Sequence, residues 1–349
     1  MGAVARQGPK LNATSLALRF DDDDYHVADL LLLALAERSW QALEDRLARG
    51  LALAREHGRG VAPARVSDEV RRFRYQRRLI SGKELRDWLE ARALELAELH
   101  RYCLRRVLVE EHGMTGERAD PGEPAAALYA EAICDGTLAR AGTRAGELAA
   151  MAAAYDARAD PAAAQVDRLV AEAEQRPRAG LDGIAGDELR RRAAAVVSLL
   201  GAEAAFIENT ATRDAIRRHV AQHGLDWVRV ECAELTFAGE GAAREAMLCL
   251  RVDGVPVARL AERIGITIRS GSHFVGDLDE RAAPLAASVA IGDPLGPFPH
   301  DGGWLVLVVE RRLPPSAQDP ELVDRATSAI VRAACERVKA GRVRELATF

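Results

Sequence analysis

The feature that most constrains the fold is a change in hydrophobic periodicity at Trp227. Before this residue, apolar side chains recur mainly at the spacing of amphipathic helices. From Trp227 onward, the stretch "DWVRVECAELTFAG" alternates apolar and polar residues, which is typical of a half-buried strand. A change of period so late in the chain predicts an α+β fold, in which a mostly helical N-terminal part precedes a small sheet.

The segments after this strand predict how the sheet is completed. "EGAAREAMLCLRVDG" and "VPVARLAERIG" have helical spacing, "ITIRSGSHFVG" is a strand that runs into a loop, and "LDERAAPLAASVAIG" is helical. The stretch Gly292–Pro315 then gives a short segment at Leu295–Phe298, a turn at "HDGG" and an apolar strand at Trp304–Glu310. We therefore expect a small sheet that ends in a hairpin and is covered by helices.

Both ends of the chain predict helices. "VADLLLLALAERSWQALEDRLARGLALAREHG" follows Asp21–Asp24, whose negative charge suits a helix N-terminus. "VAPARVSDEVRRFRYQRRLIS" and "GKELRDWLEARALELAELHRYCLRRVLVEEHG" continue the helical pattern. After two prolines, one amphipathic helix is predicted over Pro320–Leu346, with Asp319 as its cap.

Four segments are expected along the chain. "MTGERADPGEPAAA" is rich in glycine, proline and charge, which is typical of a linker. The predicted segments are a helical module at 1–115, a helical connecting region at 116–210, a sheet domain at 211–315 and a C-terminal helix at 316–349.

Composition excludes several classes of protein. The 349 residues carry a net charge of -5, whereas a general nucleic-acid binder needs a basic surface. The first apolar run, "VADLLLLALA", is too short to cross a bilayer, and nothing at the N-terminus resembles a secretory signal. The five cysteines are scattered without a C-x-x-C pair, which fits reduced thiols. We expect a cytoplasmic protein with no membrane partner, no nucleic-acid partner and no cofactor.

The late segments resemble the parvulin (PpiC-type) peptidyl-prolyl isomerases. "TRDAIRRHVAQHGLDWVRVECAELTF" is similar to the helix and first strand of that family. "AREAMLCLRVDGVPVARLAERIG" resembles its following helix, with Leu260-Ala261 close to a Leu-Ala signature, and "AASVAIGDPLGPFPHDGGWLVLVVERRLPP" resembles its ending. The resemblance implies a small sheet whose groove holds a peptide.

The N-terminal segment "RVSDEVRRFRYQRRLISGKELRDWLEARALELAELHRYCLRRVL" resembles the helical chaperone module of SurA-like proteins. In those proteins the C-terminal helix packs back on the N-terminal module, so the resemblance implies the same role for Pro320–Leu346. The implied partners are an unfolded or precursor peptide and a peptide-modifying enzyme.

The parvulin resemblance also points to site residues, with two departures. The family has a histidine on the first strand, where "VECAELTF" offers Cys232 and Glu234 as candidate catalytic residues. It has another on the last strand, where Trp304 and Leu305 stand. The expected substrate-binding residues are Trp304, Leu305, Phe274, His273 and Phe298 of the parvulin-like segments, together with Arg74 and Arg78 from the basic run of the N-terminal segment.

These departures predict a peptide-binding folding or maturation factor whose isomerase activity is lost or weakened. The alternative is an active peptidyl-prolyl isomerase with a substituted site. Rotation about an X–Pro bond needs no nucleophile, because the barrier of ~18–20 kcal/mol falls when an apolar site binds the twisted bond.

Three further clusters of polar residues give weaker evidence about function. His219 and His223 have a spacing that metals use, but no third ligand is evident, so a solvent-facing pair is favoured and no metal is expected. Ser272, His273 and Asp277 fall within one loop, whereas catalytic triads are assembled across a fold. A different enzyme built on these histidines is a third hypothesis. The basic run Arg71, Arg72, Arg74, Arg77 and Arg78 is interpreted first as a solvated helix face, and otherwise as a surface for an acidic peptide or nucleic acid.

Overall fold

The chain forms an α+β fold of helices and two small antiparallel sheets, as predicted. The computed structural model describes residues 13–119, 125–155, 160–175 and 184–346. It divides into two units: unit 1 comprises residues 1–206 and 334–349, and unit 2 comprises residues 207–333. The segment boundaries expected near residues 115, 210 and 315 stay predictions.

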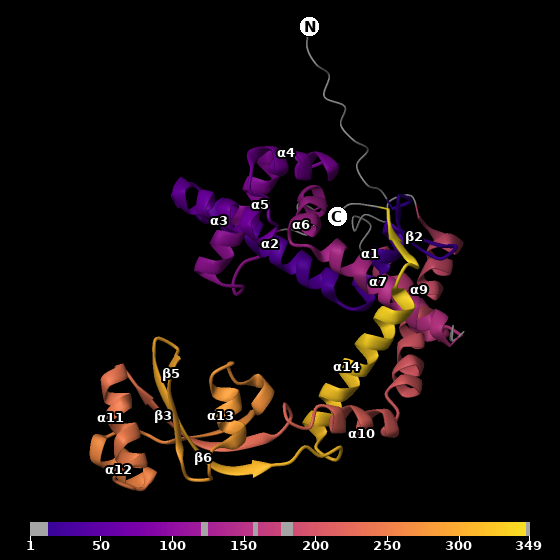
Figure 1. The fold of residues 1–349 in the computed structure, drawn as a ribbon. Coiled ribbons are helices and arrows are strands. Elements are labelled where there is room, and N and C mark those ends of the chain that lie inside the picture. The colour runs from indigo at the N-terminus through magenta and orange to yellow at the C-terminus, as the bar shows by residue number, and fades with distance from the viewer. Residues whose placement is uncertain (1–12, 120–124, 156–159, 176–183, 347–349) are drawn as a thin grey trace. The chain divides into compact units, whose positions relative to one another are not determined.

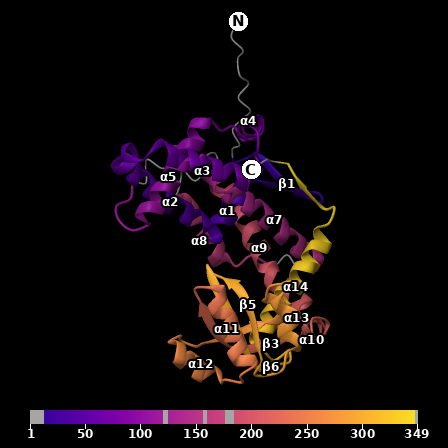
Figure 2. The ribbon, with the colours of Figure 1, turned by 60° about the vertical axis from the view of Figure 1, so that its left-hand side comes forward.

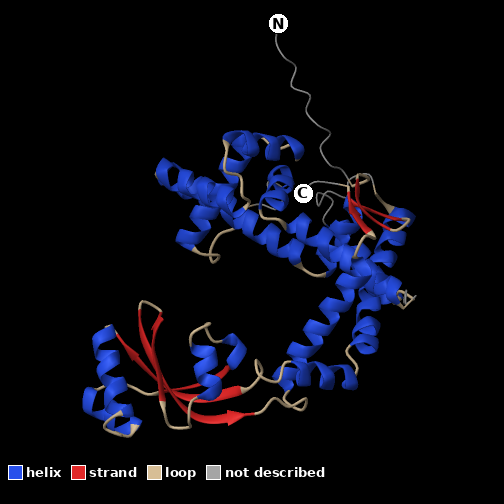
Figure 3. Ribbon diagram, viewed as in Figure 1, coloured by secondary structure: helices blue, strands red, loops and turns tan. Residues whose placement is uncertain are grey.

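Unit 1 is mostly helical, with one small sheet (Figures 1 and 3). Its elements are β1 (Leu16–Phe20), β2 (Asp23–His26), α1 (Val27–Ala36), α2 (Ser39–His57), η1 (Gly58–Gly60), α3 (Pro63–Gln76), α4 (Gly82–Ala91), α5 (Leu96–His112), α6 (Ala125–Cys134), α7 (Thr137–Ala154), α8 (Ala163–Gln175), most of α9 (Gly186–Thr210) and β7 (Val343–Glu345).

Helix α1 forms the centre of the unit 1 core. Its sequence "VADLLLLALA" is apolar on every side, and a helix of that kind must be buried all round. Leu30 and Leu32 are fully buried, and α1 packs against α2, α7 and α8. Unit 1 is therefore built from helices packed around α1.

The small sheet of unit 1 was not predicted from the sequence. Its strand order is β2-β1-β7, with Leu18 opposite Tyr25 on one side and Glu345 on the other. The acidic run Asp21–Asp24 forms the β1–β2 turn and the start of β2 rather than a helix N-terminus. The predicted C-terminal helix accordingly ends at Lys339, and the chain continues into β7.

The C-terminal end packs on the N-terminal unit, as predicted. Besides the β1–β7 pairing, Arg342 forms an ion pair with Asp21 whose Nε–Oδ1 distance is 3.0 Å. The buried Cys335 thiol donates to the carbonyl oxygen of Glu147 at 3.7 Å. Residues far apart in the sequence therefore complete one core.

The helix predicted from Gly82 to Gly113 is two helices in the structure. Ser81 caps α4 because its Oγ accepts from the Glu84 amide at 3.1 Å, while the Glu84 carboxylate accepts from the Ser81 amide at 2.7 Å. Helix α4 ends at Ala91, and Ala93 takes a positive φ of 50°, which breaks the helical path before α5 begins.

Among the described helices, α9 is long and apolar enough to cross a membrane by length and composition. Core helices have the same composition, and Val196, Ala202 and Phe206 of α9 are buried inside the protein. The composition of α9 is therefore weak evidence for a membrane span.

Unit 2 is a four-stranded antiparallel sheet with helices on both faces (Figures 1 and 2). Its strand order is β4-β3-β6-β5. Its elements are α10 (Arg213–Gln222), β3 (Arg229–Phe237), α11 (Glu240–Arg251), α12 (Val257–Ile264), β4 (Arg269–Phe274), η2 (Val275–Asp277), α13 (Ala282–Ser288), β5 (Pro294–His300), β6 (Gly303–Leu313) and most of α14 (Pro320–Lys339).

The two faces of this sheet have separate cores. Helices α11 and α12 cover one face, where Leu235, Met247 and Val306 meet. Helix α13 covers part of the other face, where Cys232 and Leu307 pack with Ala286. Because side chains alternate along a strand, the central strands β3 and β6 each contribute to both cores.

The closing hairpin follows from its turn residues. Asp301 and Gly302 both have positive φ angles, 44° and 77°, between the paired residues His300 and Gly303. Two such residues match the twist of an antiparallel hairpin, which explains the "HDGG" signal. The turn sets β5 beside β6 at one edge of the sheet.

Candidate functional site

The candidate site lies on the α13-covered face of the unit 2 sheet, beyond the part that α13 buries. Alternation along β3 places Cys232 and Glu234 on this face. The β3–β4 register brings in His273, and its Nε2 lies 2.6 Å from Oε1 of Glu234. The sequence analysis named both residues without predicting that they touch.

Gly271 makes this contact possible. It stands opposite Cys232 in the register, between the side chains of Glu234 and His273. A Cβ added at Gly271 would lie 1.8 Å from Oε1 of Glu234 and 2.8 Å from Nε2 of His273. The absence of a side chain at Gly271 therefore leaves the space in which the carboxylate and imidazole meet.

Cys232 lies beneath this pair as a neutral thiol. Its exposed fraction is 1%, and burial raises its pKa to about 11, with a further contribution from the negative charge of Glu234. A thiol with so high a pKa is a poor nucleophile at neutral pH. Cys232 therefore supports the face by packing and does not fit nucleophilic catalysis.

A partly exposed apolar side chain, Leu305, lies near the polar pair on the same face. Glu234 stands opposite Leu307 and Thr236 stands opposite Leu305 in the β3–β6 register, and Phe298 of β5 stands opposite Leu305. Leu305 is partly exposed and packs against the same core as Phe298. The face thus combines a hydrogen-bonding pair with apolar side chains, which is the composition of a site for small ligands or peptide side chains.

Trp304 does not share this face. It packs with Leu235 and Val306 against the core under α11 and α12, on the opposite side of the sheet from Leu305. This separation follows from the strand period of two. The structure places Leu305 and Phe298 near Glu234 and places Trp304 away from it.

Phe274 serves a different purpose from the one expected. Its ring is 2% exposed and lies between two guanidinium groups, with Cζ of Arg229 at 4.4 Å and Cζ of Arg325 at 4.3 Å from the ring centre. Arg229 also bonds Asp319, and Arg325 bonds Asp277. Phe274 therefore joins the start of α14 to the sheet rather than lining an open surface.

Arg74 and Arg78 belong to unit 1, whereas the sheet face belongs to unit 2. Nε of Arg74 donates to the carbonyl oxygen of Leu79 at 3.0 Å, which fixes the connection between α3 and α4. Arg78 is exposed at the end of that turn, with a φ of 57°.

The structure also shows how the side chains of the two other candidate clusters are arranged. Asp277 accepts two hydrogen bonds from Arg325, and Ser272 lies on the face of β4 opposite to His273, so Ser272, His273 and Asp277 form no triad. His223 stacks on Trp227, the ring of His219 is tilted against both, and burial lowers the pKa of His219. Across the residues that the structure describes, no group of three metal-binding side chains forms a metal site.

The two sheet edges differ in what they can bind. Edge strand β5 contains Pro294, Pro297 and Pro299, which lack the amide hydrogen that pairing requires. Edge strand β4 has no proline, and Arg269, Ser270 and Ser272 are exposed along it. Within the described sheet, β4 is hydrogen-bonded to β3 on one side, so its outer edge has the capacity to pair with an added strand.

The sequence alone predicts which residues of this site share a face of a strand, but not which of them touch. Cys232 and Glu234 are two residues apart, as are Gly271 and His273, so each pair had to share a face if both segments were strands. The contact between Glu234 and His273 depends on the register of β3 and β4, which the sequence does not specify. The role of Gly271 in this contact was not predicted either, because it depends on the same register.

No protein-family model matches this sequence, and no curated protein matches it. Among solved structures, this chain is similar to one from a study of two structurally related SurA-like chaperones of Campylobacter jejuni. The two chaperones are the virulence factor PEB4 and the periplasmic protein Cj1289. The TM-score is 0.21 and the sequence identity is 9%, and the match covers 61% of this chain and 89% of that chain. This is a weak structural resemblance to SurA-like chaperones, and at this TM-score it carries no inference about activity or ligand.

Proposed function

We propose that the protein is a peptide-binding folding or maturation factor that holds an unfolded or precursor peptide on the open face of the unit 2 sheet. The observation that carries the proposal is the Glu234–His273 pair over Gly271, set beside the partly exposed apolar side chain of Leu305. A modifying enzyme or the folding pathway would receive the peptide. The parvulin resemblance of the sequence agrees with this role.

Peptide chemistry suits this surface. Carboxylate oxygens accept hydrogen bonds from peptide amides, and a neutral imidazole both donates and accepts. Apolar side chains of the guest, proline included, gain about 25 cal/mol for each Å² that they remove from water against the partly exposed Leu305. The free edge of β4 offers main-chain hydrogen bonds to an extended segment.

The Glu234–His273 pair also favours a second candidate function, peptidyl-prolyl isomerisation at a substituted site. The reaction needs a surface that binds the twisted X–Pro bond better than the planar one, with no covalent step. A polar pair next to an apolar surface has the required composition, although its residues differ from the two histidines of the parvulins. Cys232, as a buried neutral thiol, would then shape the site.

Both candidates are tested with fluorescent proline-containing and acidic peptides, whose binding is measured by anisotropy and whose X–Pro exchange is measured by NMR. We expect binding by the full chain and about tenfold weaker binding by Glu234→Gln, because hydrogen bonds to a charged group contribute ~1.5–3 kcal/mol. Glu231→Gln is the matched control, since Glu231 lies on the same strand and pairs with Arg311.

A second pair of variants tests the space at Gly271. Gly271→Ala pushes the carboxylate and imidazole apart, whereas Gly241→Ala adds a methyl group that meets nothing within 4 Å. Binding that only Gly271→Ala weakens, without faster X–Pro exchange, supports the binding factor. X–Pro exchange that the wild-type protein makes faster than the spontaneous rate, and that returns to the spontaneous rate with Glu234→Gln, supports the isomerase. Binding of no peptide contradicts both.

A further inference from the structure

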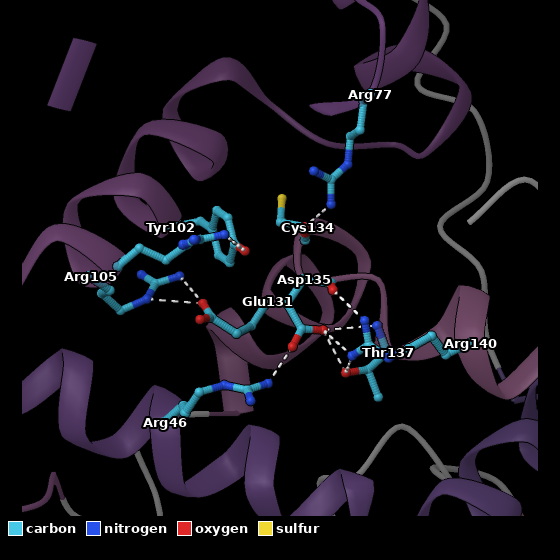
Figure 4. A network of polar contacts seen from close by, with 10 residues as sticks. Arg46, Arg77, Tyr102, Arg105, Glu131, Cys134, Asp135, Thr137 and Arg140 are labelled. Atoms are coloured by element: carbon cyan, nitrogen blue, oxygen red, sulfur yellow. Dashed lines mark hydrogen bonds and ion pairs between the residues drawn. The ribbon is translucent and has the colours of Figure 1, made fainter. Parts of the chain in front are cut away.

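Unit 1 contains a polar cavity that the proposed function does not use. Its volume is about 470 Å³, which is within the usual range for small-molecule sites. Its lining residues come from helices α2, α3, α5, α6 and α7 and from the turn before α7. Figure 4 shows the contacts that join Arg46, Arg105, Glu131, Asp135 and Arg140 of this lining. The cavity is lined by Arg46, Arg72, Tyr102, Arg105, Arg106, Val109, Glu110, Glu131, Asp135 and Arg140.

Arginines outnumber carboxylates around this cavity, five to three. Glu69, which is buried beside it and bonds Arg72 and Arg106, leaves the balance positive. Positive charge gathered in a partly enclosed cavity is less screened than on an open surface, so it attracts an anion strongly. The charge balance therefore favours an anionic over a cationic ligand.

The carboxylates of the cavity are already occupied by protein groups. Glu131 accepts two hydrogen bonds from Arg105, at 3.0 Å and 2.5 Å, through the same oxygen. Asp135 accepts from the amide of Thr137 at 2.8 Å and forms an ion pair with Arg46, as Figure 4 shows.

The arginines, in contrast, keep donors in reserve. A guanidinium group has five N–H donors on three nitrogen atoms. Among the described residues, each arginine of the cavity uses at most two of its nitrogens in protein contacts: Arg46 and Arg72 use one, and Arg105, Arg106 and Arg140 use two. Unused donors of this kind match the geometry of carboxylate and phosphate oxygens.

We infer that this cavity binds an oxyanion, a carboxylate or phosphate group carried by a small molecule or by an acidic peptide side chain. Arg46 and Arg72 reach it from α2 and α3, and both side chains are about half exposed, so they are open to a ligand. Arg105 and Arg140 hold the acidic residues of the wall in place. The inference concerns unit 1 and does not depend on peptide binding at the sheet.

The experiment is isothermal titration of the full chain with inorganic phosphate, with succinate and with a glutamate-rich peptide, in a buffer free of multivalent anions. We expect saturable binding of at least one probe that weakens as salt is added. Arg46→Gln and Arg72→Gln should each weaken it about tenfold or more, because each removes a charged donor. The probe that binds identifies the source of the oxyanion.

Arg71→Gln is the matched control, because Arg71 is next in sequence to Arg72 but pairs with the exposed Asp68 and does not line the cavity. Circular dichroism and thermal unfolding of every variant show that the fold is retained. Absence of binding by all three probes overturns the inference, as does an Arg71→Gln effect equal to that of Arg72→Gln.

Discussion

At the scale of single residues, the buried Arg105–Glu131 pair shows why charge inside a protein has to be matched. Both side chains are 5% exposed, and the pair is held by two hydrogen bonds to one oxygen. Removing an ion from water costs several kcal/mol, and the partner recovers that cost only while it is present. Each residue is therefore tolerated inside unit 1 because of the other.

We predict that Glu131→Leu lowers the free energy of unfolding by about 3–5 kcal/mol, because it leaves the Arg105 guanidinium buried without its counter-charge. Urea denaturation followed by circular dichroism measures the change. The double variant with Arg105→Met should recover most of the loss, since both charges are then absent. A double variant as unstable as Glu131→Leu would contradict this account.

The residue scale is also where sequence reasoning about the site reached its limit. The spacing of Cys232 and Glu234 was enough to place them on one face, because strands have a period of two. The position of Phe274 was not predictable, because its two guanidinium neighbours, Arg229 and Arg325, come from segments far away in the sequence. Contacts of that kind exist only after the fold has formed.

At the scale of elements, the start of α14 is fastened to the unit 2 sheet by charge. Arg229 donates to Asp319 at 2.8 Å and to Glu321 at 3.0 Å, and Arg325 makes two hydrogen bonds with Asp277 of η2. Hydrogen bonding by Arg325 lowers the pKa of Asp277 below its ordinary value of 3.8. The stabilisation from an ionised Asp277 is thus complete above pH 3.8 and is lost as the pH falls through the lower folded-state pKa.

We predict that wild-type and Asp277→Asn proteins differ in unfolding free energy above about pH 4, and that the difference disappears at lower pH. Because the side chain of Asp277 is 48% exposed, the difference should be less than about 1 kcal/mol. Urea denaturation at a series of pH values measures it. Asp253→Asn, at an exposed position between α11 and α12, is the control. A difference that persists at the lowest pH would count against the ion pair.

Elements were predicted well where the pattern is long and local. The alternation over β3, the "HDGG" turn and the helical spacing of α2, α3 and α14 needed no distant information. The β1–β2 hairpin was missed because its strands are short and its turn is a run of aspartates. The break between α4 and α5 was missed because apolar side chains continue at helical spacing across it.

At the scale of the whole molecule, the two units have cores of their own. Unit 1 is built around α1, whereas unit 2 has one apolar cluster on each face of its sheet. Leu47 and Leu307 represent these cores, with exposed fractions of 0% and 1%. Each unit is compact through contacts within itself, so a defect in one core should stay local.

We predict that Leu47→Ala and Leu307→Ala each destabilise their own unit by about 2–5 kcal/mol through a lost side chain and a cavity. Hydrogen exchange followed by mass spectrometry should show faster exchange confined to residues 1–206 and 334–349 for the first variant, and to residues 207–333 for the second. Equal acceleration in both units would contradict this independence.

The pairing of β7 with β1 has a consequence for biosynthesis. Asp21 and Arg342, which join beside these strands, are separated by 321 positions in the chain. A ribosome that adds about 5–20 residues per second makes that stretch in roughly 15–60 s, and β1 waits unpaired with β7 throughout. Residues 207–333 are all made within this interval, so unit 2 has the opportunity to fold during translation while the sheet of unit 1 is still missing a strand.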